Sequence, residues 1–345
     1  GLITTGKGIN LPDSNLSAKS PAKHHWQFVE WAIKNDIDVL AMSFVPDRHD
    51  VQRLRDGIAN IQSRLALEEQ RMPIIAKVEL PAAVTNMNDV TDAADAIMIA
   101  RGDLGVEMDL TRVPVIQKQL IQAAKDHGKP CIVATQMFQS MIESPAPTRA
   151  EVSDVANAIF EDADAVMLSG ETAVGQYPIV TVDYMRRVNE ETEAYRATQP
   201  AHPTPPATLV ESQYRTAALA HGVWTTAQDF GARFIVVWSQ RGGGARYLSK
   251  HNFWIPIVAI SSDQRTTRQM QMLRGVVPVH MDPPNDLGQF TALIDEHLQS
   301  RGWAKAGDRC VLVAGNPIGR AGVTNSLCLH EIGDRASGGF FELPE

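Results

Sequence analysis

Lys77 and Glu79 are conspicuous because they interrupt an otherwise apolar segment, PIIAKVEL over residues 73–80. Residues two apart on a β-strand point to the same face, so an ammonium group and a carboxylate would leave this strand together. A strand end that reaches solvent, with the two charges paired for solubility, explains this segment alone as well as a functional site does. The residues at the other strand ends are therefore needed to distinguish a solvent-exposed charge pair from a functional site.

Four further apolar segments alternate with helix-like sequence in the first 190 or so residues. One intervening segment, 112–129, has apolar residues at three- and four-residue spacing, and Gly128 and Pro130 mark where that helix stops and the next strand starts. Strict alternation of strands and helices predicts an α/β fold with parallel strands, whose functional groups collect at the C-terminal strand ends. The five predicted strands cover 38–44, 73–79, 95–100, 130–136 and 164–169.

All five predicted strand ends carry groups able to bind a metal, a phosphate or a proton. A helix cap or an isolated hydrogen bond accounts for one polar residue at such a position, but poorly for a series at one rim. These residues are Ser43, then Lys77 and Glu79, then Asp103, then Thr135 and Gln136, and finally the segment from Ser169 to Glu171.

Lys77, Glu79 and Asp103 would meet over one site, with two carboxylates for a hard cation and an ammonium group for an anionic substrate. Mg²⁺ suits such a site because it takes few carboxylates and keeps room for substrate oxygens. Zinc is not expected, since no His or Cys cluster has ligand spacing. Gly102 and Gly105, in ARGDLG, place backbone N–H groups beside Asp103 that could face a carboxylate or a phosphate.

Composition excludes several classes of protein. The chain has 345 residues, 44% of them hydrophobic, which is enough for more than one packed core. The net charge of −8, without a long basic run, argues against nucleic acid as a partner. We expect no membrane association and a cytoplasmic location, because the sequence has neither an apolar span nor a signal peptide. Cys131, Cys310 and Cys328 are widely spaced, as expected of reduced thiols in a cytosolic protein.

The second part of the chain begins after a proline-rich linker, residues 197–208. Predicted strands near 233–238, 256–260, 276–279 and 309–314 indicate a second α/β unit over 209–345. Two of its loops could cradle a phosphate, although ordinary flexible turns explain them nearly as well. The residues concerned are Ser239, Gln240, Arg241, Gly242, Gly243 and Gly244 in the first loop, and Arg320 in the second, 315–325.

Several long motifs together resemble the pyruvate kinase family. They are KGINLP (7–12), IIAKVEL (74–80), IMIARGDLGVE (97–107), KPCIVATQMFQSMIESPAPTRAEVSDVANAI (129–159) and DAVMLSGETAVGQYP (164–178). The resemblance extends through essentially the whole chain. It implies a partial (β/α)8 TIM-type barrel, with five of its eight strands present, followed by a C-terminal three-layer α/β domain. Residues 1–12 would return from the family's lid domain, 13–196 would belong to the catalytic barrel, and 209–345 would be the effector and oligomerisation domain.

The same resemblance implies phosphoryl transfer from phosphoenolpyruvate to ADP, giving pyruvate and ATP in the last step of glycolysis. Lys77 would stabilise the phosphoryl group in flight, and Glu79 and Asp103 would hold Mg²⁺ or Mn²⁺. Thr135 would lie on the face where the enolate is protonated, through water. The implied substrate-binding residues are Ser43, Arg101, Gly102, Asp103, Thr135 and Gln136, with Ser169 and Glu171 on the same rim.

The chain departs from the family pattern in two respects. Three barrel strands, the lid and the usual K⁺ ligands are not found, so we expect a piece of a longer enzyme that is inactive alone. A non-catalytic homologue acting as a sensor or assembly subunit is the alternative; a related barrel lyase is disfavoured by PTRAEVSDVANA (147–158). The family implies a homotetramer with a phosphorylated allosteric effector. The loop at Ser239 differs from the type that grips fructose bisphosphate, and a nucleotide or sugar monophosphate is the better expectation.

Overall fold

The computed structural model of the chain describes residues 21–67, 70–199, 207–211, 213–251, 254–315, 318 and 322–334. These residues divide into two compact units. Unit 1 comprises the described part of 1–125 and 129–196, and unit 2 that of 126–128 and 197–345. The domain bounds drawn from the sequence stay a prediction, and the predicted return segment, residues 1–12, lies outside the described residues.

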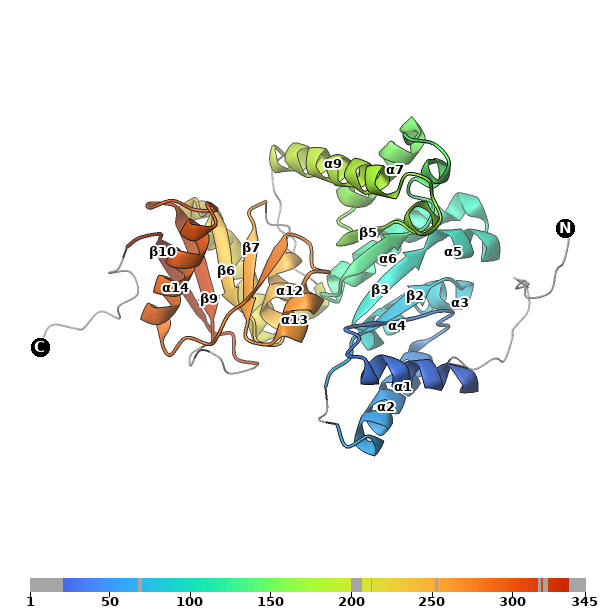
Figure 1. Cartoon of the computed structure of the whole chain (residues 1–345), viewed down its shortest axis with the longest axis horizontal. Helices are drawn as coiled ribbons and strands as arrows, with labels where there is room; N and C mark the ends of the chain where they lie inside the picture. The colour runs from blue at the N-terminus through green and yellow to red at the C-terminus, as the bar shows by residue number, and fades with distance from the viewer. Residues whose placement is uncertain are drawn as a thin grey trace, which may run out of the picture. The chain divides into compact units, whose positions relative to one another are not determined.

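Unit 1 is built on five parallel strands in the order β1-β2-β3-β4-β5 (Figure 1). The sequence predicts all five, but the strands are slightly shorter than predicted. Phe44 and Thr135 adopt left-handed backbone conformations, with φ of 54° and 68°, which regular strand pairing does not accommodate. The predicted polar residues therefore lie in the turns that follow the strands. The bounds are β1 Leu40–Met42, β2 Ile74–Val78, β3 Ala96–Ala100, β4 Cys131–Ala134 and β5 Ala165–Met167.

Helices connect these strands, with α1 and α2 at one end of unit 1 and α7 and α9 at the other (Figure 1). Local capping determines several of their ends. Asp47 caps α2 by accepting from the N–H groups of His49 and Asp50, and Gly128, at φ 62°, follows α6. The helices are α1 Trp26–Lys34, α2 Arg48–Arg64, α3 Pro81–Thr85, α4 Met87–Ala93, α5 Arg101–Glu107, α6 Val113–Asp126, α7 Arg149–Phe160, α8 Gly170–Ala173 and α9 Pro178–Ala197, with 3₁₀ turns η1 Lys23–His25, η2 Leu110–Arg112 and η3 Gln139–Ile142.

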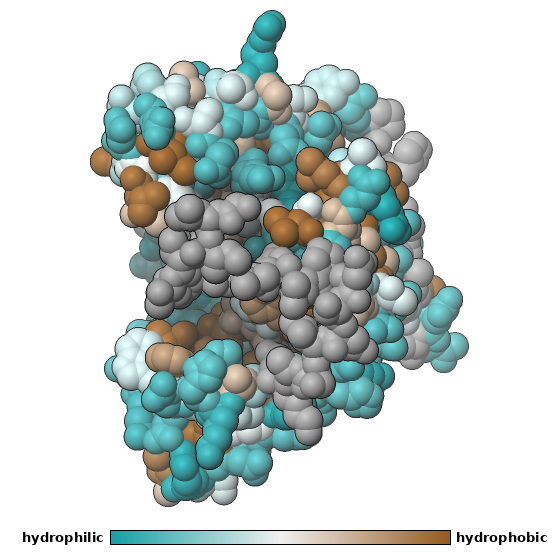
Figure 2. Space-filling model, turned by 90° about the vertical axis from the view of Figure 1, so that its right-hand side faces the viewer, coloured by the Kyte–Doolittle hydropathy of each residue, from teal (hydrophilic) through white to brown (hydrophobic). Residues whose placement is uncertain are grey.

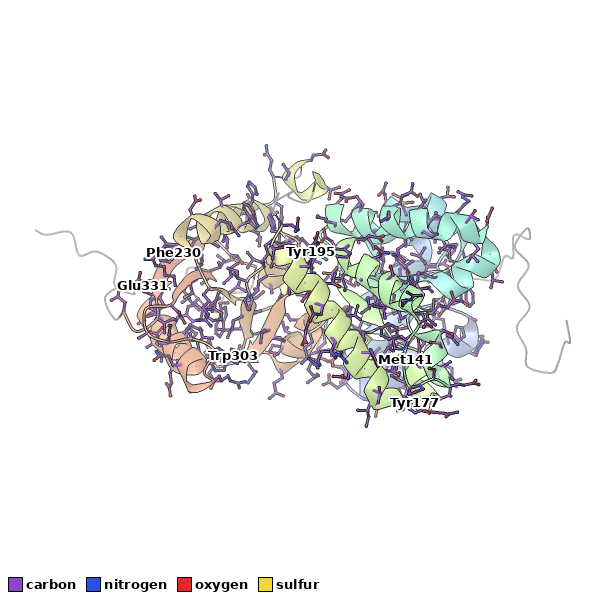
Figure 3. All side chains as sticks on the ribbon, turned by 90° about the horizontal axis from the view of Figure 1, so that it is seen from above. Met141, Tyr177, Tyr195, Phe230, Trp303 and Glu331 are labelled. Carbon is purple, nitrogen blue, oxygen red and sulfur yellow. The ribbon has the colours of Figure 1, made fainter. Side chains whose placement is uncertain are left out.

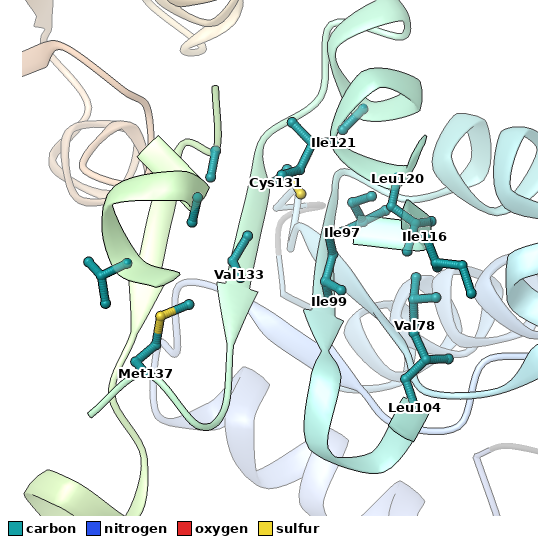
Figure 4. Packing of buried hydrophobic residues seen from close by; sticks show 14 of the residues in the cluster. Val78, Ile97, Ile99, Leu104, Ile116, Leu120, Ile121, Cys131, Val133 and Met137 are labelled. Carbon is teal, nitrogen blue, oxygen red and sulfur yellow. The ribbon is translucent and has the colours of Figure 1, made fainter. Parts of the chain in front are cut away.

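Alternate strand residues of unit 1 face the helices and form its core. Ile97 and Ile99 of β3 are fully buried and pack with Ile116 and Leu120 of α6 (Figure 4). Val133 of β4 belongs to the same cluster. The strand residues between them face the other side of the sheet, which is the side from which Lys77 projects, since Lys77 is paired with Met98 in the β2–β3 register.

Unit 2 contains a second five-stranded sheet, in the order β10-β9-β6-β7-β8. The first four of its strands in the sequence are the predicted ones, and they are parallel. The fifth, β10, was not predicted and pairs antiparallel with β9. The elements are α10 Ala207–Glu211, α11 Arg215–Phe230, β6 Phe234–Trp238, α12 Gly243–Ser249, β7 Ile257–Ser261, α13 Gln264–Met270, β8 Val276–His280, α14 Leu287–Ser300, β9 Arg309–Ala314 and β10 Ser326–Glu331.

The two faces of this sheet are covered by different helices. Ile235 and Val237 of β6 pack with α11 and α12, whereas Phe234 and Trp238 pack with α14, where Trp238 meets Phe290 edge to face. Every residue of β6 is buried, as expected of a central parallel strand. Unit 2 therefore has the predicted three-layer α/β architecture.

Each unit carries hydrophobic residues on its surface as well as in its core. On the face drawn in Figure 2, hydrophobic side chains lie scattered among hydrophilic ones. Tyr177 and Tyr195 mark the two ends of α9 in Figure 3. In unit 2, Phe230 and Glu331 lie close together in the same view, and Arg309 contacts both.

Within the residues that the structure describes, no helix combines the length and the apolar character needed to cross a membrane.

Candidate active site at the strand ends

Lys77 and Glu79 leave the end of β2 on the same side and form an ion pair, with Lys77 Nζ 2.5 Å from Glu79 Oε1. Lys77 Nζ also donates to Ser43 Oγ at 2.9 Å, and the N–H of Phe44 donates to Glu79 Oε2 at 2.7 Å. Glu79 is only 1% exposed, whereas the Lys77 side chain is 24% exposed. The arrangement ties the end of β1 to the end of β2 and leaves the ammonium group within reach of a ligand.

Asp103 lies in the first turn of α5, directly after the neighbouring strand β3. Its carboxylate makes no hydrogen bond or ion pair with any residue that the structure describes, so its oxygens are available to a cation. No group of three or more His, Cys, Asp or Glu side chains among the described residues is arranged to hold a metal. Glu79 and Asp103 nevertheless suit Mg²⁺, because Mg²⁺ takes one or two carboxylates and completes its shell with water and substrate oxygens.

Thr135 and Gln136 follow β4 with two consecutive left-handed residues, at φ 68° and 55°. This conformation is unusual for any residue with a side chain, and especially for β-branched threonine. The Thr135 hydroxyl accepts a hydrogen bond from Gly102 N–H at 2.7 Å and donates to Ala134 O at 2.6 Å. One lone pair of the hydroxyl oxygen remains available to water or to a substrate.

The Arg101 side chain lies in the interior of unit 1, not over the site. It is 8% exposed, and its guanidinium group donates to both carboxylate oxygens of Asp154, at 2.7 and 2.8 Å. It also donates to Thr135 O at 2.7 Å. Any contact of Arg101 with a substrate would therefore come from its backbone.

Ser169 and Glu171 connect the ends of β4 and β5. Glu171, 1% exposed, accepts hydrogen bonds from Phe138 N–H at 3.0 Å and from Ser169 N–H at 2.8 Å. Two backbone donors thus hold one buried carboxylate. This arrangement makes Glu171 a brace between two rim turns.

Asp154, the partner of Arg101, lies on helix α7, and a capping box holds the start of this helix. Thr148 Oγ1 accepts from Glu151 N–H, while Glu151 accepts from the N–H of Thr148 at 2.8 Å and from that of Ser140 at 2.7 Å. Burial raises the pKa of Glu151, but the hydrogen bonds from Ser140 and Thr148 outweigh it, so the pKa lies below its ordinary value.

Sequence reasoning missed three residues that support this rim, namely Phe44 on the rim itself and Gln117 and Asp154 behind it. Phe44 is 52% exposed and donates its N–H to Glu79. Gln117 and Asp154 both contact Arg101. Gln117, 4% exposed, is a polar residue on the buried face of an amphipathic helix and therefore needs a partner, whereas Asp154, with a side chain 40% exposed, has no such signal.

The glycine-rich loop of unit 2 is held largely by contacts within the unit. Ser239 Oγ accepts from Ala245 N–H at 3.1 Å, and Gln240 Nε2 donates to Ser262 Oγ at 2.8 Å. Gly242 is left-handed, at φ 75°, which favours glycine there. Arg241 is exposed and has no ion-pair partner among the residues described. Gly243 and Gly244 open α12. Arg320, the predicted partner in the second loop, lies outside the described residues.

The chain has clear relatives. Residues 1–182 match the family described as "Pyruvate kinase, barrel domain", and residues 217–330 match "Pyruvate kinase, alpha/beta domain". A pyruvate kinase of Mycobacterium intracellulare is 37% identical over 334 residues, which are 97% of this chain and 68% of that protein. The pyruvate kinase of Thermotoga maritima is 33% identical, over 95% of this chain and 67% of its own length, and that of Geobacillus stearothermophilus is 36% identical, over 97% and 56%.

Fold and site together define an α/β protein of the barrel class, with charged groups gathered at the C-terminal ends of parallel strands. Both family matches and all three relatives point to the same family within that class. The chain belongs to the pyruvate kinase family. The fold predicted from the resemblance, part of a (β/α)8 barrel followed by a C-terminal α/β domain, is thereby confirmed.

Proposed function

We propose that the protein, in the full length that its gene encodes, transfers the phosphoryl group of phosphoenolpyruvate to ADP and so forms pyruvate and ATP. The observation that carries the proposal is the Lys77–Glu79 pair at the end of β2, beside Asp103 at the end of β3, in a chain of this family. Phosphoryl transfer needs positioning and charge neutralisation more than covalent participation by the protein, and these groups supply both.

Each rim residue has a separate part in the proposed reaction. Lys77 places its ammonium group against the phosphoryl oxygens, and Ser43 and Glu79 orient it. Glu79 and Asp103 would hold Mg²⁺ or Mn²⁺, which would neutralise charge on the substrate oxygens when bound. The resemblance also allows K⁺ as a second cofactor, to which we assign no ligands among the described residues.

In this proposal, the start of α5 binds the carboxylate of the substrate and Thr135 takes part in protonation of the enolate. Gly102 N–H already donates to Thr135 Oγ1. We therefore assign the substrate carboxylate to the N–H of Asp103, which lies in the first turn of α5 and has no intrahelical partner. The enolate would receive its proton through a water molecule hydrogen-bonded to the free lone pair of the Thr135 hydroxyl. Gln136 would line the same rim.

Substitution of the two carboxylates tests the metal assignment. Glu79→Gln or Asp103→Asn should weaken Mg²⁺ binding and phosphoenolpyruvate binding together, because the metal would join protein and substrate. Mg²⁺ titrations at several phosphoenolpyruvate concentrations measure both. Asp89→Asn, at an exposed position in the first turn of α4, is the matched control.

The outcomes separate the proposals. Unchanged Mg²⁺ dependence in both variants would contradict the ligand assignment. A wild-type protein that binds Mg²⁺ but does not turn over phosphoenolpyruvate and ADP would instead favour the non-catalytic homologue.

For unit 2 we propose a phosphorylated effector at the glycine-rich loop. The proposal is supported by the left-handed Gly242 and the exposed guanidinium of Arg241, which could together face a phosphate. The expected homotetramer is also a proposal, to be tested by sedimentation velocity.

A further inference from the structure

A largely buried polar network, in which only Asp154 has a strongly exposed side chain (40%), lies behind the candidate site, between the end of β4 and helices α6 and α7. Its centre is the Arg101 guanidinium, whose Nη1 pairs with Asp154 and lies 3.4 Å from Gln117 Oε1. Gln117, 4% exposed, donates in turn to Glu161 Oε2 at 2.8 Å. On its other side the guanidinium reaches backbone carbonyls of the turn after β4, with Thr135 O at 2.7 Å.

This network coincides with the strained backbone of the rim. Thr135 and Gln136 are both left-handed, and the carbonyl groups of residues 134–136 all lie within 3.4 Å of Arg101 nitrogens. Such a conformation persists only when its surroundings hold it in place. Arg101 supplies the donors that hold it, because a planar guanidinium offers five N–H groups in a fixed fork.

Arg101 can remain in this position only if its charge is balanced. At 8% exposure, an arginine without an anionic partner would leave a buried charge uncompensated. Asp154 supplies that partner, since both of its carboxylate oxygens accept from Arg101 Nη1, and Gln117 offers a further acceptor. Loss of Asp154 should therefore turn the guanidinium toward solvent and allow the Thr135–Gln136 turn to relax.

The Thr135 hydroxyl is the group that such relaxation would move. It reaches Gly102 N–H, at 2.7 Å, only while Thr135 keeps its left-handed φ of 68°. A Cβ atom on Gly102 would lie only 3.4 Å from Thr135 Oγ1, so the two turns are in close contact. Movement at Asp154 would therefore be transmitted from α7 to the rim.

We propose that Asp154 and Gln117 are positioning residues, which act through Arg101 to hold the left-handed Thr135–Gln136 turn and so place the Thr135 hydroxyl. Both contact Arg101, whose side chain lies in the interior of unit 1 and not over the site. The inference rests on the function proposed above, because it assigns the Thr135 hydroxyl to proton delivery.

Amide hydrogen exchange in the full-length protein without substrate tests the brace directly. Asp154→Asn keeps the shape of the side chain but removes its charge. It should speed exchange of the Gly102 amide by about ten- to a hundredfold, because the charged hydrogen bonds between Arg101 and Asp154, which hold the turn in place, are lost. Gln117→Leu should act in the same direction but less, since its contact with Arg101 is long. Asp183→Asn, which breaks a surface ion pair on α9, should leave Gly102 unchanged.

The rate of proton exchange at the pyruvate methyl group tests the link to Thr135. Asp154→Asn should lower this rate with little change in KM for phosphoenolpyruvate, and on a Thr135→Val background it should lower it little further, since both changes act on one hydroxyl. Additive losses, or an unchanged Gly102 amide in both Asp154→Asn and Gln117→Leu, would overturn the proposal. If Thr135→Val alone leaves methyl exchange unchanged, the proposed role of Thr135 fails, while the Gly102 amide still decides whether the brace exists.

Discussion

Glu171 offers a sharp test of whether a buried rim carboxylate supports structure or binds substrate. Its two oxygens each accept from one backbone N–H, those of Phe138 and Ser169, and the side chain is 1% exposed. In Glu171→Gln, the amide oxygen can accept from only one of these donors, while the amide NH₂ faces the other. One buried N–H would then lose its acceptor, and the remaining bond would lose its ionic partner.

The magnitude follows from these two losses. An unsatisfied buried donor costs about 1–3 kcal/mol, and a hydrogen bond to a neutral group is weaker than one to a charged group by about 1 kcal/mol. We therefore expect Glu171→Gln to lower the free energy of local unfolding by about 2–4 kcal/mol. Because two compact units need not unfold in one transition, the suitable assay is native-state hydrogen exchange at Phe138 and Ser169.

Glu190→Gln provides the matched control. Glu190 lies on α9, its side chain is 60% exposed, and among the residues that the structure describes it pairs only with a surface arginine, Arg186. The same chemical change there should alter stability by less than about 0.5 kcal/mol. If Glu171→Gln leaves exchange at both amides unchanged but raises the KM for substrate, the brace interpretation is wrong and Glu171 is a binding residue.

Three further predictions concern stability, transfer and regulation. Burial raises the pKa of Asp95, but Arg71, Arg55 and the Ile74 N–H together lower it by more, so the pKa lies below its ordinary value of 3.8. A depressed pKa contributes stability above the unfolded pKa that is lost as the pH falls through the folded one. Asp95→Asn should therefore lower the free energy of unfolding by about 2–4 kcal/mol at pH 7, and the variant should lose less stability than the wild type as the pH falls below about 4. Urea unfolding at pH 7 and below about pH 4 measures both effects. If the substitution lowers the free energy of unfolding equally at neutral and at acidic pH, this linkage is wrong. Lys77→Met should depress phosphoryl transfer while proton exchange at the methyl group of added pyruvate stays measurable, and complete loss of that exchange would contradict the division of labour. Arg241→Ala should weaken binding of a sugar phosphate or nucleotide monophosphate by about 1.5–3 kcal/mol in calorimetric titration; equal binding by the variant, or none by the wild type at millimolar concentration, would leave the loop an ordinary connection.

Most of the framework of both units could be predicted from local sequence patterns. The apolar segment at 73–79 has the length and flanks of a strand, and the two-residue period alone places Lys77 and Glu79 on one face, where they pair at 2.5 Å. Gly128 and Pro130 likewise indicate where a helix ends and a strand begins. Such features depend on neighbours in the chain, so they can be read without knowing what packs against them.

Features that depend on distant contacts could not be predicted in this way. The sequence showed that Arg101 follows a strand, but only the tertiary structure turned its side chain toward Asp154, 53 residues away. Strand β10 was missed although it is as long as β9, because it pairs antiparallel at the edge of the second sheet and most of its side chains are only partly buried. The left-handed Thr135 and Gln136 also have no local signal, since neither is a glycine. A side chain's direction and a strained backbone are decided by the donors, acceptors and charges that folding brings around them, and these come from other elements of the chain.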